Sequence, residues 1–255
     1  MASLFQAVLV IIIGAICGIL INYLADVLPI YRKPGPAICP NCSKKFTPYN
    51  YLISFRCKNC GQGVSLRTLL VHIFSISASF LFWIFPYQNL NYWWTIPVII
   101  FLGVILVIDI EYRVVLIQTS ITGLILLFII GTVNQGFSIK GLITTFVGGA
   151  VGFGIMILFY YLGVLFSKVM SKARNQDIDE VALGFGDVYV STFLGFLIGW
   201  PNIIAAIITG VIISGVFSLF YLVILSVLRK YKAFSAIPYA PFLILGALVV
   251  PYLFK

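Results

Sequence analysis

The chain has 255 residues, of which 62% are hydrophobic and 9% are charged, and its mean hydropathy is +1.12. This composition excludes an ordinary soluble globular domain and indicates a polytopic membrane protein in contact with the lipid bilayer. The formal net charge of +9 would suggest nucleic-acid binding in a soluble protein. Here the basic residues lie between apolar runs, where they set orientation, so we expect no nucleic-acid partner.

The apolar runs predict an all-α fold. A transmembrane helix needs roughly 20 mostly apolar residues. By this measure the sequence predicts about eight transmembrane helices, near 4–25, 68–86, 93–110, 115–133, 141–166, 184–199, 202–227 and 236–254. The first run is too long for the core of a secretion signal and no basic residue precedes it, so we expect a retained helix.

The lysines and arginines predict the orientation of the helices. If the amino terminus lies outside, all sixteen of them except Lys140 and Lys255 fall on the inner side of the membrane. Cytoplasmic loops are enriched in basic residues. We therefore expect the amino terminus outside and the long loop after the first helix in the cytoplasm.

That long loop, residues 31–66, contains two Cys-x-x-Cys pairs, Cys39 with Cys42 and Cys57 with Cys60, which 14 residues separate. Four thiolates from two such pairs make a closed tetrahedral site for structural Zn²⁺. Two disulfides are the alternative, but the predicted cytoplasmic location is reducing. Four thiolates with no redox partner also favour zinc over iron. We expect a small zinc-binding domain whose folding depends on the metal.

The organisation predicted from these features has three parts. Residues 1–30 form the first transmembrane helix, residues 31–66 form the loop domain with four cysteines, and residues 67–255 form a seven-helix membrane domain.

Two aspartates stand at the margins of apolar runs. Asp109 ends the third predicted helix and Asp187 begins the sixth, on the same side of the membrane. Ionisable groups at such depth are costly and are usually functional. Two carboxylates that share one pocket can split the roles of base and acid in peptide hydrolysis. The alternative is that both residues merely end helices, where Asp187 would be favourable at a helix amino terminus.

The neighbours of the aspartates are secondary candidates. Gly184 and Gly186 precede Asp187 and would let a backbone approach it closely. Glu111 and Arg113 follow Asp109 and either tune the site or solvate a loop.

Several motifs occur in an order that resembles the bacterial prepilin peptidases, or type IV leader peptidases, of the GxGD aspartyl protease group. The motifs are Gly18-Ile19-Leu20-Ile21-Asn22, the four cysteines, Ser65-Leu66-Arg67, Ile108-Asp109-Ile110-Glu111, Gly184-Phe185-Gly186-Asp187-Val188, Leu194-Gly195, Gly199-Trp200-Pro201 and Pro238-Tyr239-Ala240-Pro241-Phe242-Leu243 with Gly246-Ala247.

The resemblance implies an enzyme of the bacterial inner membrane. Such an enzyme removes the basic leader from type IV prepilins or type II secretion pseudopilins at the cytoplasmic membrane face. Asp109 and Asp187 match the catalytic aspartates. Many members then methylate the new amino terminus with S-adenosylmethionine, an activity associated with the cytoplasmic loop.

Three other functions stay open at this stage. The first is a related protease that acts on other membrane-anchored precursors without methyl transfer. The second is a proton-coupled carrier, because acids within membranes also relay protons. The third is a zinc-stabilised scaffold, in which replacement of either aspartate would leave function intact.

Overall fold

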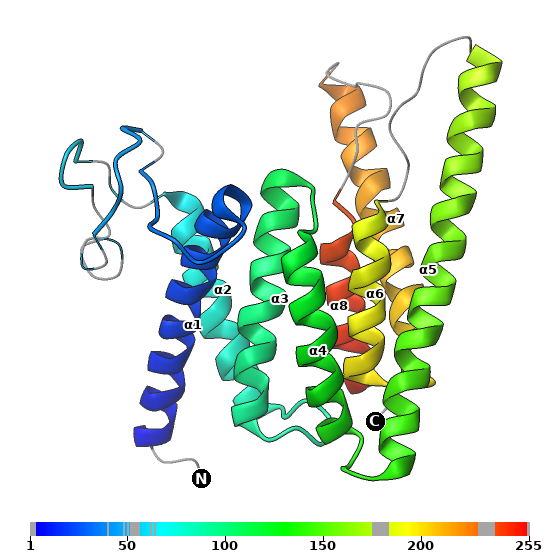
Figure 1. Ribbon diagram of the computed structural model, residues 1–255, viewed down its shortest axis with the longest axis horizontal. Coiled ribbons are helices and arrows are strands. Elements are labelled where there is room, and N and C mark those ends of the chain that lie inside the picture. The colour runs from blue at the N-terminus through cyan, green and yellow to red at the C-terminus, as the bar shows by residue number, and fades with distance from the viewer. Residues whose placement is uncertain are drawn as a thin grey trace. The chain divides into compact units, whose positions relative to one another are not determined.

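The computed structural model describes residues 4–39, 41–47, 49, 51, 57–61, 63, 65–174, 184–228 and 238–253. Within these described residues, eight α-helices follow one another (Figure 1). Their bounds are α1 Leu4–Tyr31, α2 Leu66–Ile84, α3 Tyr92–Tyr112, α4 Ile117–Asn134, α5 Ile139–Arg174, α6 Phe185–Ile198, α7 Asn202–Val227 and α8 Ala240–Leu253. The only pairing of extended backbone within the described residues is an isolated bridge between Ile38 and Lys45. The predicted all-helical class is confirmed.

Helix length divides the eight helices into two groups. Six of them, α1 to α5 and α7, are long and apolar enough to cross a membrane, whereas α6 and α8 have 14 residues each. Helix α5 has 36 residues, which corresponds to about 54 Å against a hydrocarbon core of about 30 Å. Helix α5 extends beyond the predicted range 141–166, because good helix formers such as Lys168 and Lys172 continue the helix past the apolar run.

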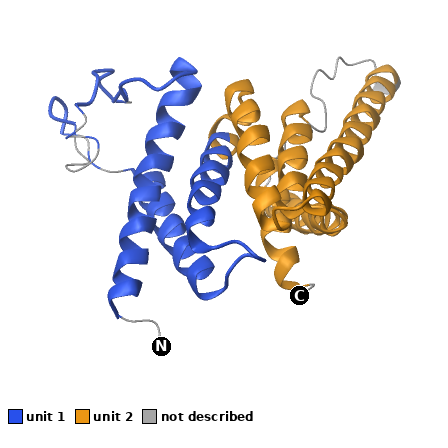
Figure 2. Ribbon diagram, turned by 60° about the horizontal axis from the view of Figure 1, so that its bottom comes forward, with its two compact units in different colours: residues 1–108 blue, residues 109–255 orange. Residues whose placement is uncertain are grey.

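The chain divides into two compact units, residues 1–108 and residues 109–255 (Figure 2). In the first unit α1 packs on α2. Gly14 makes this approach close, because a Cβ there would lie 2.7 Å from the Cα of Ile76. Ser75 Oγ donates a hydrogen bond to the carbonyl of Gly14 at 2.9 Å, and Ser79 Oγ donates to the carbonyl of Val10 at 3.1 Å. Small residues and interhelical hydrogen bonds are typical of helix pairs within membranes.

Helix α6 is the centre of the second unit, where it contacts α4, α5, α7 and α8. Ten of its 14 residues are buried, as expected for a helix that is apolar on every side. Glycines bring the neighbouring backbones very close. A Cβ on Gly195 would lie 2.3 Å from the carbonyl oxygen of Gly148 on α5, and one on Gly131 of α4 would meet the carbonyl of Phe196.

Side chains from the end of α4 satisfy the last carbonyls of α6. Asn134 Nδ2 donates to the carbonyl of Leu197 at 3.0 Å, and Gln135 Nε2 donates to that of Ile198 at 2.9 Å. These carbonyls would otherwise be unpaired at a helix end. Helix α6 is therefore held along its sides and at its carboxyl end.

The close contact between α5 and α6 makes Gly195→Ala destabilising. The added methyl forces the backbones of α5 and α6 apart, and such overpacking typically costs about 1–3 kcal/mol. We expect a lower midpoint of thermal unfolding in detergent micelles. Gly154→Ala on α5 is the matched control, because no heavy atom lies within 4 Å of its added Cβ. Equal midpoints for the two variants would contradict the packing described.

Candidate active site and metal cluster

Asp109 and Asp187 both belong to the second unit and come together there. Asp109 lies in the last turn of α3 and is 5% exposed, and Asp187 lies in the first turn of α6 and is 7% exposed. The two carboxylates are close enough to interact electrostatically. The expected juxtaposition of these two residues is thus present in the structure.

A backbone group from α8 contacts Asp109. The N–H of Ala240, the first residue of α8, donates a hydrogen bond to the Asp109 carboxylate. The amino end of a helix carries a partial positive charge that favours an anion. Oδ2 of Asp109 is buried and has no hydrogen-bond partner among the described residues. An unpaired buried carboxylate oxygen is costly, so this atom is the one that a bound water molecule or a substrate would satisfy.

Asp187 exchanges hydrogen bonds with the residue that begins its own helix. Its carboxylate accepts from the backbone N–H of Gly184, and its N–H donates to the carbonyl of Gly184 at 3.1 Å. The bond from the Asp187 carboxylate to the Gly184 N–H is one half of a capping box, and the other half is missing because the N-cap residue is a glycine. Asp187 therefore stabilises the amino end of α6, which is the structural role that the sequence also allowed for it. It has this role while lying near Asp109.

The two glycines before Asp187 meet different surroundings. A Cβ on Gly186 would lie 2.7 Å from the Cβ of Val115, in the segment between α3 and α4. A Cβ on Gly184 would meet nothing closer than Oδ2 of Asp187, at 3.6 Å. Only the second glycine of the motif is thus required by close packing.

The residues after Asp109 lie at the end of α3. Arg113 follows the helix with a φ of 55° and donates its N–H to the carbonyl of Asp109 at 2.9 Å. Its side chain is exposed yet near enough to act electrostatically on the Asp109 carboxylate. Glu111 is exposed on the last turn of α3, which favours solvation as its role.

Sequence reasoning gave no role to Tyr239, Ala240 or Ser214. Tyr239 interacts electrostatically with Asp187, and its hydroxyl is hydrogen-bonded to Ser214 of α7. The motif around Tyr239 is visible in the sequence, but its nearness to the aspartates arises from the packing of α7 against α8.

The four cysteines of the loop form one cluster in the first unit. Their Sγ atoms all lie within 4.8 Å of one another, with 3.6 Å between Cys39 and Cys60 and 3.5 Å between Cys42 and Cys57. A disulfide requires about 2.05 Å, so these sulfurs are not joined in disulfides. Four sulfurs around one tetrahedral Zn²⁺ at 2.3 Å stand about 3.8 Å apart. The cluster therefore fits a metal ion.

Both Cys-x-x-Cys turns have the same backbone geometry. The N–H of Ser43 donates to the carbonyl of Cys39, and the N–H of Gly61 donates to that of Cys57, each at 2.9 Å. Ser43 and Gly61 both have positive φ angles, 55° and 69°. Backbone N–H groups of Cys60 and Asn59 lower the pKa of Cys57 to about 6, which favours the thiolate that metals bind.

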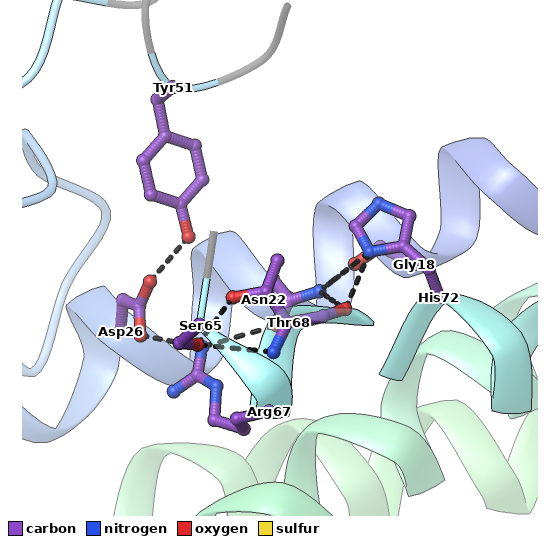
Figure 3. A network of polar contacts seen from close by, with 8 residues as sticks. All are labelled: Gly18, Asn22, Asp26, Tyr51, Ser65, Arg67, Thr68 and His72. Atoms are coloured by element: carbon purple, nitrogen blue, oxygen red, sulfur yellow. Dashed lines mark hydrogen bonds and ion pairs between the residues drawn. The ribbon is translucent and has the colours of Figure 1, made fainter. Parts of the chain in front are cut away.

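Tyr51 attaches the cysteine loop to α1 and α2 (Figure 3). Its hydroxyl donates to the Asp26 carboxylate, which also pairs with Arg67 at 2.7 Å. Arg67 in turn donates to Asn22 Oδ1 at 3.2 Å. The ring of Tyr51 packs against that of Tyr23. Burial, and then the Asp26 carboxylate, raise the pKa of Tyr51, which keeps this hydroxyl a donor.

Replacement of one cysteine of the cluster is expected to release the metal. Purified protein should contain about one zinc per chain by elemental analysis, and Cys57→Ser should reduce this content several-fold, because three ligands bind the ion more weakly. Cys17→Ser is the matched control, since Cys17 is buried in α1. A metal content that Cys57→Ser leaves unchanged would refute the four-cysteine site.

The family comparison agrees with the geometry of the second unit. Residues 96–219 match the model of the type IV leader peptidase family, and the match includes both Asp109 and Asp187. The comparisons with curated proteins and with solved structures gave no match. The resemblance inferred from the motifs is confirmed over this region. By this match, residues 96–219 belong to the type IV leader peptidase family.

Proposed function

We propose that this membrane peptidase is an aspartic endopeptidase with Asp109 and Asp187 as its catalytic pair. The observation that carries the proposal is the convergence of two buried carboxylates from α3 and α6, with Oδ2 of Asp109 available to a water. The family match supports peptidase activity in general. The pair of carboxylates could supply the base and the acid that this peptidase activity needs.

The mechanism divides the work between the two carboxylates. The ionised one takes a proton from a water, and the protonated one donates a hydrogen bond to the scissile carbonyl. The water oxygen then bonds to the carbonyl carbon, and the proton held by the base passes to the leaving nitrogen as the C–N bond breaks. A helical substrate must unwind locally at this point, because a helix engages its carbonyls in internal hydrogen bonds.

The substrates proposed are type IV prepilins or type II secretion pseudopilins, whose basic leaders would be cut at the cytoplasmic face of the bacterial inner membrane. The resemblance of the motifs supports this substrate class. The distribution of lysines and arginines supports an amino terminus outside and the cysteine loop in the cytoplasm. Zinc is the metal proposed for the cluster, because four thiolates favour it.

A second activity proposed from the resemblance is N-methylation of the new amino terminus with S-adenosylmethionine. The mass of the cleaved product tests it in the same samples. A product heavier by one methyl group supports the transfer, and an unmodified product counts against it.

Replacement of either aspartate is expected to abolish cleavage of a co-expressed prepilin. Asp109→Asn and Asp187→Asn remove the base or the acid while keeping side-chain shape, and the loss should be at least about 100-fold. Glu111→Gln is the matched control and should still cleave, since Glu111 is exposed at the end of α3. Cleavage by both asparagine variants at the wild-type rate would overturn the mechanism. An inactive wild type would overturn the proposed substrate.

The two glycines of the motif should differ in their tolerance of alanine. Gly186→Ala should lower the cleavage rate, because its methyl would collide with Val115, whereas Gly184→Ala should remain near wild type. Adding Val115→Ala to Gly186→Ala relieves the collision and should restore much of the rate. Equal effects of the two alanines, or no recovery in the double variant, would show that the contact with Val115 is unimportant.

A further inference from the structure

One turn of the backbone is hydrogen-bonded to Asp109 and lies within electrostatic range of Asp187. Residues 238 and 239 have no regular structure, and α8 begins at Ala240. The carbonyl of Tyr239 accepts hydrogen bonds from the N–H groups of Phe242 at 3.1 Å and Leu243 at 3.3 Å. The Ala240 N–H donates to Asp109, and the Tyr239 side chain lies in electrostatic reach of Asp187. The position of this turn therefore affects both carboxylates.

The hydroxyl of Tyr239 is fixed by a serine on α7. Ser214 Oγ donates its single proton to the carbonyl of Val211 at 2.9 Å. Because a serine hydroxyl has one proton and two acceptor sites, Ser214 accepts the hydrogen bond that joins it to Tyr239. The Tyr239 O–H is thus the donor, and its direction is set by α7.

Close packing fixes α8 against the part of α7 that carries Ser214. A Cβ on Gly246 of α8 would lie 2.3 Å from the carbonyl oxygen of Ala206. A Cβ on Gly210 of α7 would lie 3.0 Å from the carbonyl oxygen of Phe242. Ser214 is one helical turn beyond Gly210, so the start of α8 has little freedom to slide along α7.

We propose that Tyr239 is a positioning residue for the aspartate pair. Its hydrogen bond to Ser214 holds the 238–240 turn in place, so that the Ala240 N–H stays on Asp109 and the phenol stays within electrostatic range of Asp187. The inference rests on the proposed function, in which these aspartates are catalytic. A shift of the turn by a fraction of an ångström would disturb the geometry that a transition state requires, and such shifts are costly in rate.

The test compares kcat and KM of purified variants on a prepilin substrate in detergent micelles. Tyr239→Phe and Ser214→Ala each remove one partner of the hydrogen bond and should lower kcat by about 10-fold or more. KM should change less than about two-fold, because neither group holds the substrate. The double variant should be no slower than the slower single variant, since both changes remove the same bond. Ser214→Thr keeps a hydroxyl and should restore the rate.

Tyr221→Phe is the matched control, because Tyr221 also lies in the second unit and its ring stacks on Phe217 of α7. It should keep the wild-type kcat. Three results would overturn the inference, namely a wild-type kcat for Tyr239→Phe, additive losses in the double variant, or a rise in KM at constant kcat. Cleavage that survives Asp109→Asn and Asp187→Asn would instead refute the proposed function, so the two failures are distinguishable.

Discussion

The close approach of backbones around α6 is the constraint on which the second unit depends. A short apolar helix can be surrounded on all sides only if its neighbours come near, and glycines at positions 131, 148 and 195 allow this. Asn134 and Gln135 pair the last carbonyls of α6. With its sides and its carboxyl end fixed, α6 presents Asp187 at its amino end in a defined place beside Asp109. A carboxylate pair that splits acid and base roles requires such rigidity.

In the first unit, the cysteine loop has little apolar core, and interactions of another kind order it. Two backbone turns of the same geometry, ending at Ser43 and Gly61, direct four sulfurs toward one point. Tyr51 then attaches the loop to α1 and α2 through the ion pair of Asp26 and Arg67. The cluster of four cysteines, which could hold a metal ion, and the hydrogen-bonded ion pair at the base of the loop are separate features, and both lie on the same short segment.

Much of this arrangement could be predicted from the sequence, because apolar runs, cysteine spacing and the aspartates are local patterns. The ends of helices were harder to predict. Helix α5 continues through Lys168 and Lys172, and α8 begins only at Ala240, after Pro238 and Tyr239. The roles of Tyr239, Ser214 and Val115 were missed for another reason. Their contacts join residues far apart in the chain, and the collision that distinguishes Gly186 from Gly184 exists only after packing.

Asp109 and Asp187 lie within electrostatic range of each other, and chemical cross-linking measures this proximity in the protein itself. In a Cys17→Ser background, and with zinc added to occupy the proposed four-cysteine site, Asp109→Cys with Asp187→Cys is treated with a short reagent that joins two thiols. Glu111→Cys with Asp187→Cys is the control, because Glu111 is exposed two residues beyond Asp109. Peptide mass spectrometry should find a link between positions 109 and 187 and little between 111 and 187. A link in the control pair alone would contradict this proximity.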